Sequence, residues 1–223
     1  MKKLIIFGNE KMAEMAHFYF SHDSTYEVAA FTVDSSYIKE KEFRGLPVVP
    51  FEDIINLYPP DDFNMFVALG YKSLNMIREK KYFEAKGKGY EIPSYLSSKA
   101  SHWGDTKIGE NCFILENQVL QPNITIGNNV VLWSGNHFGH DVVIGDSTWL
   151  ASHIVVSGNV KIGKYCFVGV NACFKDHINI GNECIIGAGS IILRDVPDKS
   201  VYIPKMTELF RLNSEEFERM MGA

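Results

Sequence analysis

The sequence predicts a small α/β domain in residues 1–95, a parallel β-helix in residues 96–197, and a tail with a helix in residues 198–223. Two periods in the second half of the chain predict the β-helix. Apolar segments that alternate with helix-like segments predict the α/β domain. The most regular pattern therefore lies in the middle of the chain.

The first period is six residues long. Starting at Ile108, every sixth position carries an apolar residue, without one slip of register as far as Ile192. An α-helix repeats every ~3.6 residues and a strand every two, so neither produces this pattern. The positions are all Ile, Leu, Val or Phe, namely Ile108, Ile114, Leu120, Ile126, Leu132, Phe138, Ile144, Leu150, Val156, Ile162, Val168, Phe174, Ile180, Ile186 and Ile192.

The second period is eighteen residues long, or three of the six-residue units. It is marked by an Ile-Gly pair at 108–109, 126–127, 144–145, 162–163 and 180–181. Three units therefore form one triangular coil, and each residue lies beneath the residue eighteen positions later at about 4.8 Å, the spacing of paired strands. The glycine after each isoleucine suits a tight corner, where a positive φ is often required.

Small and β-branched residues are common four positions after each anchor, where the inner faces of a narrow prism meet. Cys112, Cys166 and Cys184 share this position, and the chain has no C-x-x-C pair. We therefore expect the cysteines to fill the core rather than to bind metal or form disulfides. No metal site is predicted.

The first 95 residues lack the six-residue period. Strands are expected at 3–7, 27–33, 46–49 and 63–70, and helices after the first, third and last of them, which predicts a small parallel sheet with helices on its faces. Ligands bind such sheets at the carboxyl ends of the strands. The substrate-binding residues expected there are Gly8, Asn9, Lys11 and Asp34. A purely structural or trimer-packing role for this domain is the alternative.

Charge and hydropathy restrict the partners and the compartment. The net charge of −5 and the pI of about 5.8 give no reason to expect a nucleic-acid partner. No apolar run approaches the ~20 residues that cross a bilayer, so no membrane partner is expected. The first residues, MKKLIIFGNE, have a short apolar run without the cleavage pattern of a signal peptide. We therefore expect a cytoplasmic protein.

The repeat is similar to a six-residue signature that consists of an aliphatic residue, a small residue, two free positions and another small residue. With a short α/β domain before it, this repeat resembles the left-handed β-helix sugar-nucleotide acetyltransferases of the sialic-acid O-acetyltransferase and bacillosamine N-acetyltransferase type. The resemblance implies a left-handed helix, acetyl-CoA as co-substrate, a nucleotide sugar as acceptor, and a homotrimer with active clefts between neighbouring prisms. The first loop of this family often carries Ser-Gly-His-Gly, where this chain has FGNEKMAE.

The segment GHDVVIGD, residues 139–146, resembles the catalytic segment of that family. The resemblance implies that His140 is the general base and that Asp141 orients or polarises it. One coil later, Gly158 leaves room above the imidazole for a substrate. Asp141 is expected to point to the other face of the prism, unless a corner turns it inward.

Two other histidines compete for a part in the site. His137 stands three residues before His140, and His153 lies in the next coil on a different side of the triangle. In a trimer His153 can reach the cleft of a neighbouring chain, so we expect it to contact the substrate. The family often has a second histidine nine residues after the catalytic one, where this chain has Trp149.

The family lays the pantetheine arm of coenzyme A along later coils, against backbone groups. The positions that match are Gly158, Gly169, Val170, Gly187 and Ala188. We therefore expect these residues to bind the co-substrate.

The end of the chain carries two further signals. Residues 156–205 hold more basic than acidic side chains, which favours binding of the phosphates of coenzyme A, with a solvated surface as the alternative.

The tail predicts an amphipathic helix with Leu209, Phe210 and Phe217 on its apolar side. We expect this helix to cover the open end of the prism, which otherwise exposes unpaired strand edges.

These features together predict an acetyl-CoA-dependent N-acetyltransferase that acts on a nucleotide-linked amino sugar, in the synthesis of lipopolysaccharide or another surface glycan. His140 is expected to deprotonate the amine, and direct transfer needs no serine or cysteine nucleophile. A sugar O-acetyltransferase needs the same base and is the nearest alternative. A non-catalytic binding prism is the third.

Overall fold

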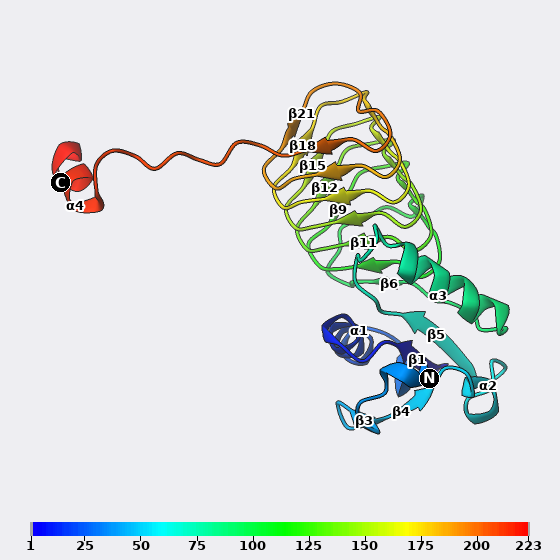
Figure 1. Cartoon of the computed structure of the whole chain (residues 1–223). Helices are drawn as coiled ribbons and strands as arrows, with labels where there is room; N and C mark the ends of the chain where they lie inside the picture. Colours follow the sequence, from blue (N-terminus) through cyan, green and yellow to red (C-terminus); the bar gives the residue numbers. More distant parts are fainter. Residues whose placement is uncertain (1, 223) are drawn as a thin grey trace.

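The computed structural model describes residues 2–222 and has three parts: an α/β domain, a long β-helix, and an extended tail that ends in a helix (Figure 1). The elements of the first part are β1 (Lys2–Phe7), α1 (Lys11–His22), β2 (Tyr26–Val33), the 3-10 turn η1 (Ser35–Tyr37), β3 (Glu42–Phe43), β4 (Leu46–Pro50), α2 (Ile54–Leu57), β5 (Phe63–Val67) and α3 (Met76–Gly87).

The sheet of the first domain has the strand order β3-β4-β2-β1-β5. β1, β2, β4 and β5 are parallel, as predicted, but β3 and β4 form an antiparallel hairpin at the edge. The hairpin turns at Arg44 and Gly45, which both have positive φ, as a tight two-residue turn requires.

The order of the sheet places its topological switch point between β1 and β5. From β1 the chain builds outward through β2 and β4, and it then returns to the other side of β1 as β5. Ligands bind at the carboxyl ends of strands at such a point. Gly8 follows β1 there with a φ of 135°, and a Cβ on it would lie 2.8 Å from the carbonyl oxygen of Ala68. Only glycine fits this place without a shift of the backbone.

The second part is a β-helix of two-residue strands, and the second residue of each strand from β7 to β21 is one of the predicted anchors. The strands are β6 (Tyr95–Leu96), β7 (Lys107–Ile108), β8 (Phe113–Ile114), β9 (Val119–Leu120), β10 (Thr125–Ile126), β11 (Val131–Leu132), β12 (His137–Phe138), β13 (Val143–Ile144), β14 (Trp149–Leu150), β15 (Val155–Val156), β16 (Lys161–Ile162), β17 (Phe167–Val168), β18 (Cys173–Phe174), β19 (Asn179–Ile180), β20 (Ile185–Ile186), β21 (Ile191–Ile192) and β22 (Val201–Tyr202).

Except for β20 and β22, which are offset by sixteen residues, these strands pair with a register of eighteen residues, and together they form three flat faces. We call them face 1 (β7, β10, β13, β16, β19), face 2 (β6, β8, β11, β14, β17, β20, β22) and face 3 (β9, β12, β15, β18, β21). The corners between them are corner 1/2, corner 2/3 and corner 3/1. The anchors point inward and form one continuous core, in which Cys112, Cys166 and Cys184 are fully buried.

Residues other than glycine turn the corners. At corner 1/2, for example, Asn111 and Asn129 have φ values of 54° and 59°, a region that asparagine tolerates well. The glycine after each isoleucine anchor does not have a positive φ, so that expectation is wrong. It serves the stacking of coils instead, because a Cβ on Gly127 would lie 2.5 Å from Oδ1 and 2.8 Å from the backbone nitrogen of Asp146.

The α/β domain packs against face 2. Phe20 and Phe66 share a buried cluster with Phe113, Val131 and Trp149, which point outward from that face. Beside this cluster, α3 follows corner 1/2 (Figure 1), where the Asn75 side chain donates to the carbonyl oxygen of Ser147 at 2.8 Å. The domain therefore covers face 2 from β6 to β17 and leaves the other two faces bare.

The tail differs from its expected place. Its helix α4 (Ser214–Met221) begins with a capping box between Asn213 and Glu216, but the tail extends away from the prism (Figure 1). No residue of α4 is buried, and Leu209 is 99% exposed. In the single chain the tail therefore does not cover the open end. Phe210 and Phe217 pack on each other instead, with ring centroids 5.5 Å apart.

Candidate active site

His140 and Asp141 form a bonded pair at corner 3/1. His140 follows β12 on face 3, and the Nδ1 atom of its ring lies 2.7 Å from Oδ2 of Asp141. Asp141 has a φ of 59°, so the corner turns its side chain back toward the histidine. Asp141 therefore does not point to the other face of the prism, because the corner turns it toward His140. The two side chains are 57% and 44% exposed.

Neighbouring coils hold this pair in place. The Asn123 side chain, one coil below, donates to Oδ1 of Asp141 at 3.1 Å, and the side-chain oxygen of Gln121 accepts from the His140 backbone N–H at 2.9 Å. The hydrogen bonds from His140 and then from Asn123 lower the pKa of Asp141. Asp141 is therefore an anion throughout the neutral range and accepts the proton on Nδ1 of His140.

A proton fixed on Nδ1 leaves Nε2 of His140 as the acceptor nitrogen. Gly158 lies against this side of the ring, because a Cβ on it would be 2.7 Å from Nε2. Because residue 158 is a glycine, no side chain at this position blocks the edge of the ring. A neutral imidazole held in this tautomer, with an open Nε2, can take a proton from a bound nucleophile.

His153 and His137 stand elsewhere on the coil. His153 turns corner 2/3 with a φ of 58°, and its ring lies against Gly135, whose added Cβ would be 2.6 Å from Nδ1. His137 is on β12, on the outer side of face 3. Within one chain, His140 and His153 thus mark the two opposite edges of face 3.

Trp149 belongs to the domain interface. It is 3% exposed on face 2, its ring centroid is 5.2 Å from that of Tyr71, and the guanidinium of Arg78 lies 5.6 Å from it. The position nine residues after His140 therefore has no access to a substrate in this chain. Its residue type follows from the packing of the α/β domain.

The residues expected to bind coenzyme A divide between two corners. Gly158 is at corner 3/1, whereas Gly169, Val170, Gly187 and Ala188 are at corner 2/3. Coils stack closely at the second group, because a Cβ on Gly169 would lie 2.5 Å from the backbone nitrogen of Ala188. One chain does not bring the two groups together.

Face 3 separates these corners and is bare and largely apolar. Val119, Val155 and Ile191 point outward from it and are 41%, 47% and 68% exposed. Face 1 carries Lys107 and Lys161 at equivalent positions. An exposed apolar strip of this kind commonly marks a contact surface.

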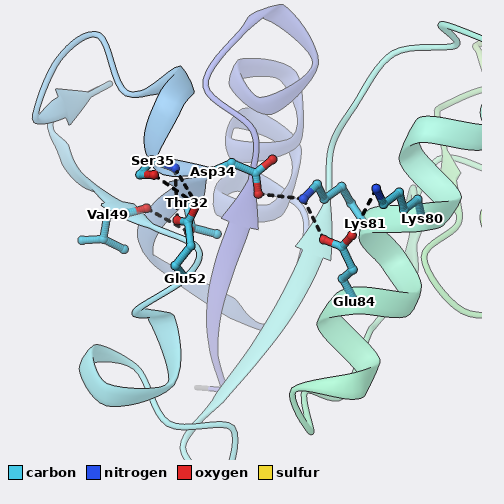
Figure 2. Close-up of polar contacts among 8 residues, drawn as sticks. All are labelled: Thr32, Asp34, Ser35, Val49, Glu52, Lys80, Lys81 and Glu84. Carbon is cyan, nitrogen blue, oxygen red and sulfur yellow. Dashed lines mark hydrogen bonds and ion pairs between the residues drawn. The ribbon is translucent and has the colours of Figure 1, made fainter.

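The structure places the expected sugar-nucleotide residues at the carboxyl edge of the first sheet. The Asn9 side chain donates to the carbonyl oxygen of Tyr37 at 3.1 Å, and Oδ1 of Asp34 accepts from Nζ of Lys81 at 2.6 Å (Figure 2). Lys11 does not join them, since its ammonium pairs with Glu14 on the same helix at 3.0 Å.

Sequence reasoning missed Lys81 as a member of this group. It stands in the run REKK, where a lysine on a helix cannot be distinguished from a surface residue. The loops at this edge lie over face 2, because Tyr71, four residues after β5, packs against Trp149 and Phe167 of that face. His140 is at the opposite corner of the prism.

Among residues 2–222, no three His, Cys, Asp or Glu side chains gather as a metal site requires. No helix within these residues is long and apolar enough to cross a membrane.

Two family models match segments of the β-helix. The model described as bacterial transferase hexapeptide (six repeats) matches residues 105–140, and the hexapeptide repeat of succinyl-transferase matches residues 159–194. No curated protein matches the chain.

Several solved structures are similar over most of the chain. The acetyltransferase domain of PglB from Neisseria gonorrhoeae is 21% identical with a TM-score of 0.79, and the match covers 90% of this chain and 96% of that one. PerB from Caulobacter crescentus, in complex with CoA and GDP-perosamine, is 23% identical with a TM-score of 0.77, over 89% and 92% of the two chains. WeeI from Acinetobacter baumannii is 19% identical with a TM-score of 0.58, over 89% and 94%.

At identities this low, the similarity to these structures shows that the chains share a fold. The prediction of a small α/β domain followed by a left-handed parallel β-helix of hexapeptide repeats is confirmed.

Proposed function

We propose that the protein is an acetyl-CoA-dependent N-acetyltransferase that acts on a nucleotide-linked amino sugar. The observation that carries this proposal is the His140–Asp141 pair, exposed at a corner of a hexapeptide prism with Nε2 of His140 open. A base in that form suits the removal of a proton from an amine. We further propose that the product enters the synthesis of a surface polysaccharide or glycan, and that the protein is cytoplasmic.

The similar structures support this choice of substrates. PerB was solved with CoA and GDP-perosamine, and the PglB domain was solved with acetyl coenzyme A. Variants of the Caulobacter enzyme with one histidine replaced by asparagine or alanine were solved with the same two ligands. In that enzyme, the replaced histidine is therefore not needed for either ligand to bind.

The proposed reaction is a direct transfer. The amine of the sugar attacks the thioester carbonyl, Nε2 of His140 takes the proton that the amine loses, and Asp141 stabilises the imidazolium that forms. The C–S bond then breaks, and the coenzyme A thiolate leaves. Cys112 and Cys166 do not serve as nucleophiles in this scheme, because burial raises the pKa of Cys112 to about 11 and that of Cys166 to about 12.

The placement of the parts supports a shared site in a homotrimer. The nucleotide loops of one chain lie over its own face 2, whereas His140 is at the opposite corner. We therefore infer that a neighbouring chain supplies the sugar nucleotide to each His140. Face 3, bare and apolar, is the surface that brings His140 of one prism close to His153 and the Gly169 and Gly187 backbone of the next.

An assay with purified protein tests the activity. Acetyl-CoA is offered with UDP-, GDP- and dTDP-linked amino sugars, and release of the coenzyme A thiol is followed together with the mass of the sugar product. We expect one of these sugars to gain an acetyl group that survives mild base, as an amide does. An acetyl group lost in base would indicate O-acetylation. Binding of ligands without any transfer would indicate a non-catalytic prism.

A subunit experiment tests the shared site. Sedimentation should report about three times 25.2 kDa. Inactive His140→Ala and inactive His153→Ala proteins should recover some activity when their subunits are mixed, because some clefts then contain both native histidines. A fully active monomer would contradict the trimeric site.

A further inference from the structure

Lys81 is almost enclosed at the carboxyl edge of the first sheet. Its Nζ donates to Oδ1 of Asp34 at 2.6 Å and to Oε2 of Glu84 at 2.7 Å (Figure 2), and its side chain is 15% exposed. The ammonium also lies 5.5 Å and 5.4 Å from the ring centroids of Phe7 and Phe51. The next residue on the same helix, Lys80, is 75% exposed and 3.9 Å from Glu84.

The loop that carries Asp34 is held from two more sides. The backbone N–H and hydroxyl of Ser35 both donate to the carboxylate of Glu52, at 3.0 and 3.1 Å (Figure 2). Asn9, from the loop after β1, donates to the carbonyl oxygen of Tyr37. The backbone that follows Asp34 is thus fixed by contacts from two other loops.

These contacts leave one carboxylate oxygen of Asp34 free. Oδ1 accepts from Lys81, whereas Oδ2 points away from it in Figure 2 and accepts no hydrogen bond from any residue in 2–222. Burial lowers the pKa of Lys81, but the bonds to Asp34 and Glu84 outweigh burial, so its pKa is raised. Lys81 therefore remains a cation at neutral pH and bridges the carboxylates of Asp34 and Glu84.

The position of Asp34 indicates what the free oxygen meets. Asp34 follows β2 directly, and β2 lies beside β1, whose Gly8 loop is at the switch point of the sheet. In sheets of this kind a diphosphate lies at the loop after the first strand, and an acid after the second strand accepts a hydrogen bond from a ribose hydroxyl.

We propose that Lys81 is a positioning residue that holds Asp34 so that Oδ2 accepts a hydrogen bond from the ribose 2′-hydroxyl of the bound nucleotide. The protein then prefers acceptors built on ribonucleoside diphosphates to those built on 2′-deoxyribonucleoside diphosphates. This inference rests on the proposed function, because it deepens the description of the nucleotide-sugar site.

Calorimetry with free nucleotides tests the inference without any acetyl transfer. The probes are UDP and GDP, each compared with its 2′-deoxy form. We expect the native protein to bind the better ribonucleotide about 10-fold or more tightly than its deoxy form, as the loss of one hydrogen bond to a carboxylate implies. Lys81→Met should reduce this preference to less than about 3-fold by weakening the ribonucleotide alone, and Lys81→Arg should restore part of it.

Lys80→Met is the matched control, because it removes a lysine from the same helix without touching Asp34. It should keep the native preference. Affinity for coenzyme A, which binds on the prism, reports whether each variant is folded. If Lys81→Met does not fold, Asp34→Ala in the native background should abolish the preference in the same way.

Each result decides something. A preference that survives in Lys81→Met or in Asp34→Ala overturns the inference and leaves the proposed function intact. Equal weakening of ribo and deoxy forms by Lys81→Met also overturns it, because Lys81 is then only structural. A native protein that binds none of the four nucleotides overturns the inference, whereas the proposed function is then decided by the transfer assay, which also offers a dTDP-linked sugar.

Discussion

Corner 1/2 and corner 3/1 of the prism have the same backbone but opposite surroundings. Asn129 and Asp141 each stand three residues after an anchor, and each turns its corner with a φ of 59°. Asn129 is 1% exposed beneath α3, whereas the Asp141 side chain is 44% exposed. The repeat therefore supplies equivalent positions, and the α/β domain decides which of them are available for chemistry.

The covered corner uses its polar side chains to hold the domain. Asn111 donates to Asn129, and Asn129 donates to Ser147, so that a ladder of buried hydrogen bonds runs up the corner. Its members also bond the domain, since the Asn111 side chain accepts from the Val67 N–H at 2.8 Å and the Ser147 hydroxyl donates to Glu79 at 2.8 Å. Buried groups of this kind are costly to leave unpaired.

The bare corner has a similar ladder with nothing over it. Asn123 donates to Asp141, and Asp141 bonds His140. These side chains face solvent and contribute little to stability. Replacements at the bare corner should therefore affect activity, and replacements at the covered corner should affect stability.

The largest effect is expected from His140→Ala. The rate constant kcat should fall about 10²- to 10⁴-fold, the usual loss when a general base is removed. Thiol release from acetyl-CoA measures the rate, and calorimetry should show unchanged coenzyme A affinity. The melting temperature should stay within a degree or so of native, because the side chain is 57% exposed. If the variant were fully active, a group other than His140 would have to take the proton from the amine.

Asp141→Asn should have a smaller effect on kcat, about 10- to 100-fold. An amide accepts the proton on Nδ1 of His140 less well than a carboxylate and does not stabilise the imidazolium. Steady-state kinetics should show the loss in kcat with little change in KM for either substrate. If KM rises and kcat stays native, Asp141 binds the substrate and does not support the base.

At the covered corner, Asn129→Ala should lower the free energy of unfolding by about 1–3 kcal/mol more than Asn117→Ala. Both residues have positive φ, so alanine causes the same backbone strain in both variants. Asn117 is exposed, however, whereas Asn129 has buried partners. Denaturant unfolding measures the difference. Activity per folded molecule should be native in Asn129→Ala. Equal losses would show that the buried ladder contributes nothing net.

The smallest expected effect concerns acid stability on the covered side. Hydrogen bonds from Ser98 and Tyr95 hold the pKa of Asp23 at about 2, below its ordinary 3.8. Asp23 therefore stabilises the fold above about pH 4 and loses this contribution as the pH falls toward 2. Asp23→Asn should be less stable at pH 7, by about 1 kcal/mol or less, and should equal the native protein near pH 2.

Thermal unfolding between pH 7 and pH 2 measures the effect of Asp23→Asn. Asp61→Asn, an exposed acid of the same domain, is the control and should follow the native curve. A gap between Asp23→Asn and native protein that persists at pH 2 would assign the loss to packing and not to charge.

The sequence predicted the β-helix well because its period is the geometry of the coil itself. It did not reveal why glycine follows the isoleucine in each Ile-Gly pair, since a glycine needed for a positive φ and a glycine needed for close coils look the same in a sequence. His140 and Asp141 are adjacent in the sequence, but the direction of the Asp141 side chain depends on a positive φ. An aspartate in a sequence does not indicate whether its φ is positive. The burial of Trp149 depends on the α/β domain, which lies outside the repeat. The six-residue and eighteen-residue periods therefore could not predict this contact.

The position of β6 has a consequence for how the chain is made. Tyr95 of β6 is 2% exposed, its hydroxyl donates to Asp23 of the α/β domain at 2.6 Å, and β6 pairs with β8 of face 2. The first strand of that face is thus fixed by a domain that the ribosome has already completed. Each later coil needs only the coil before it as a template. The prism can therefore wind in the order of synthesis, with the α/β domain as its seed.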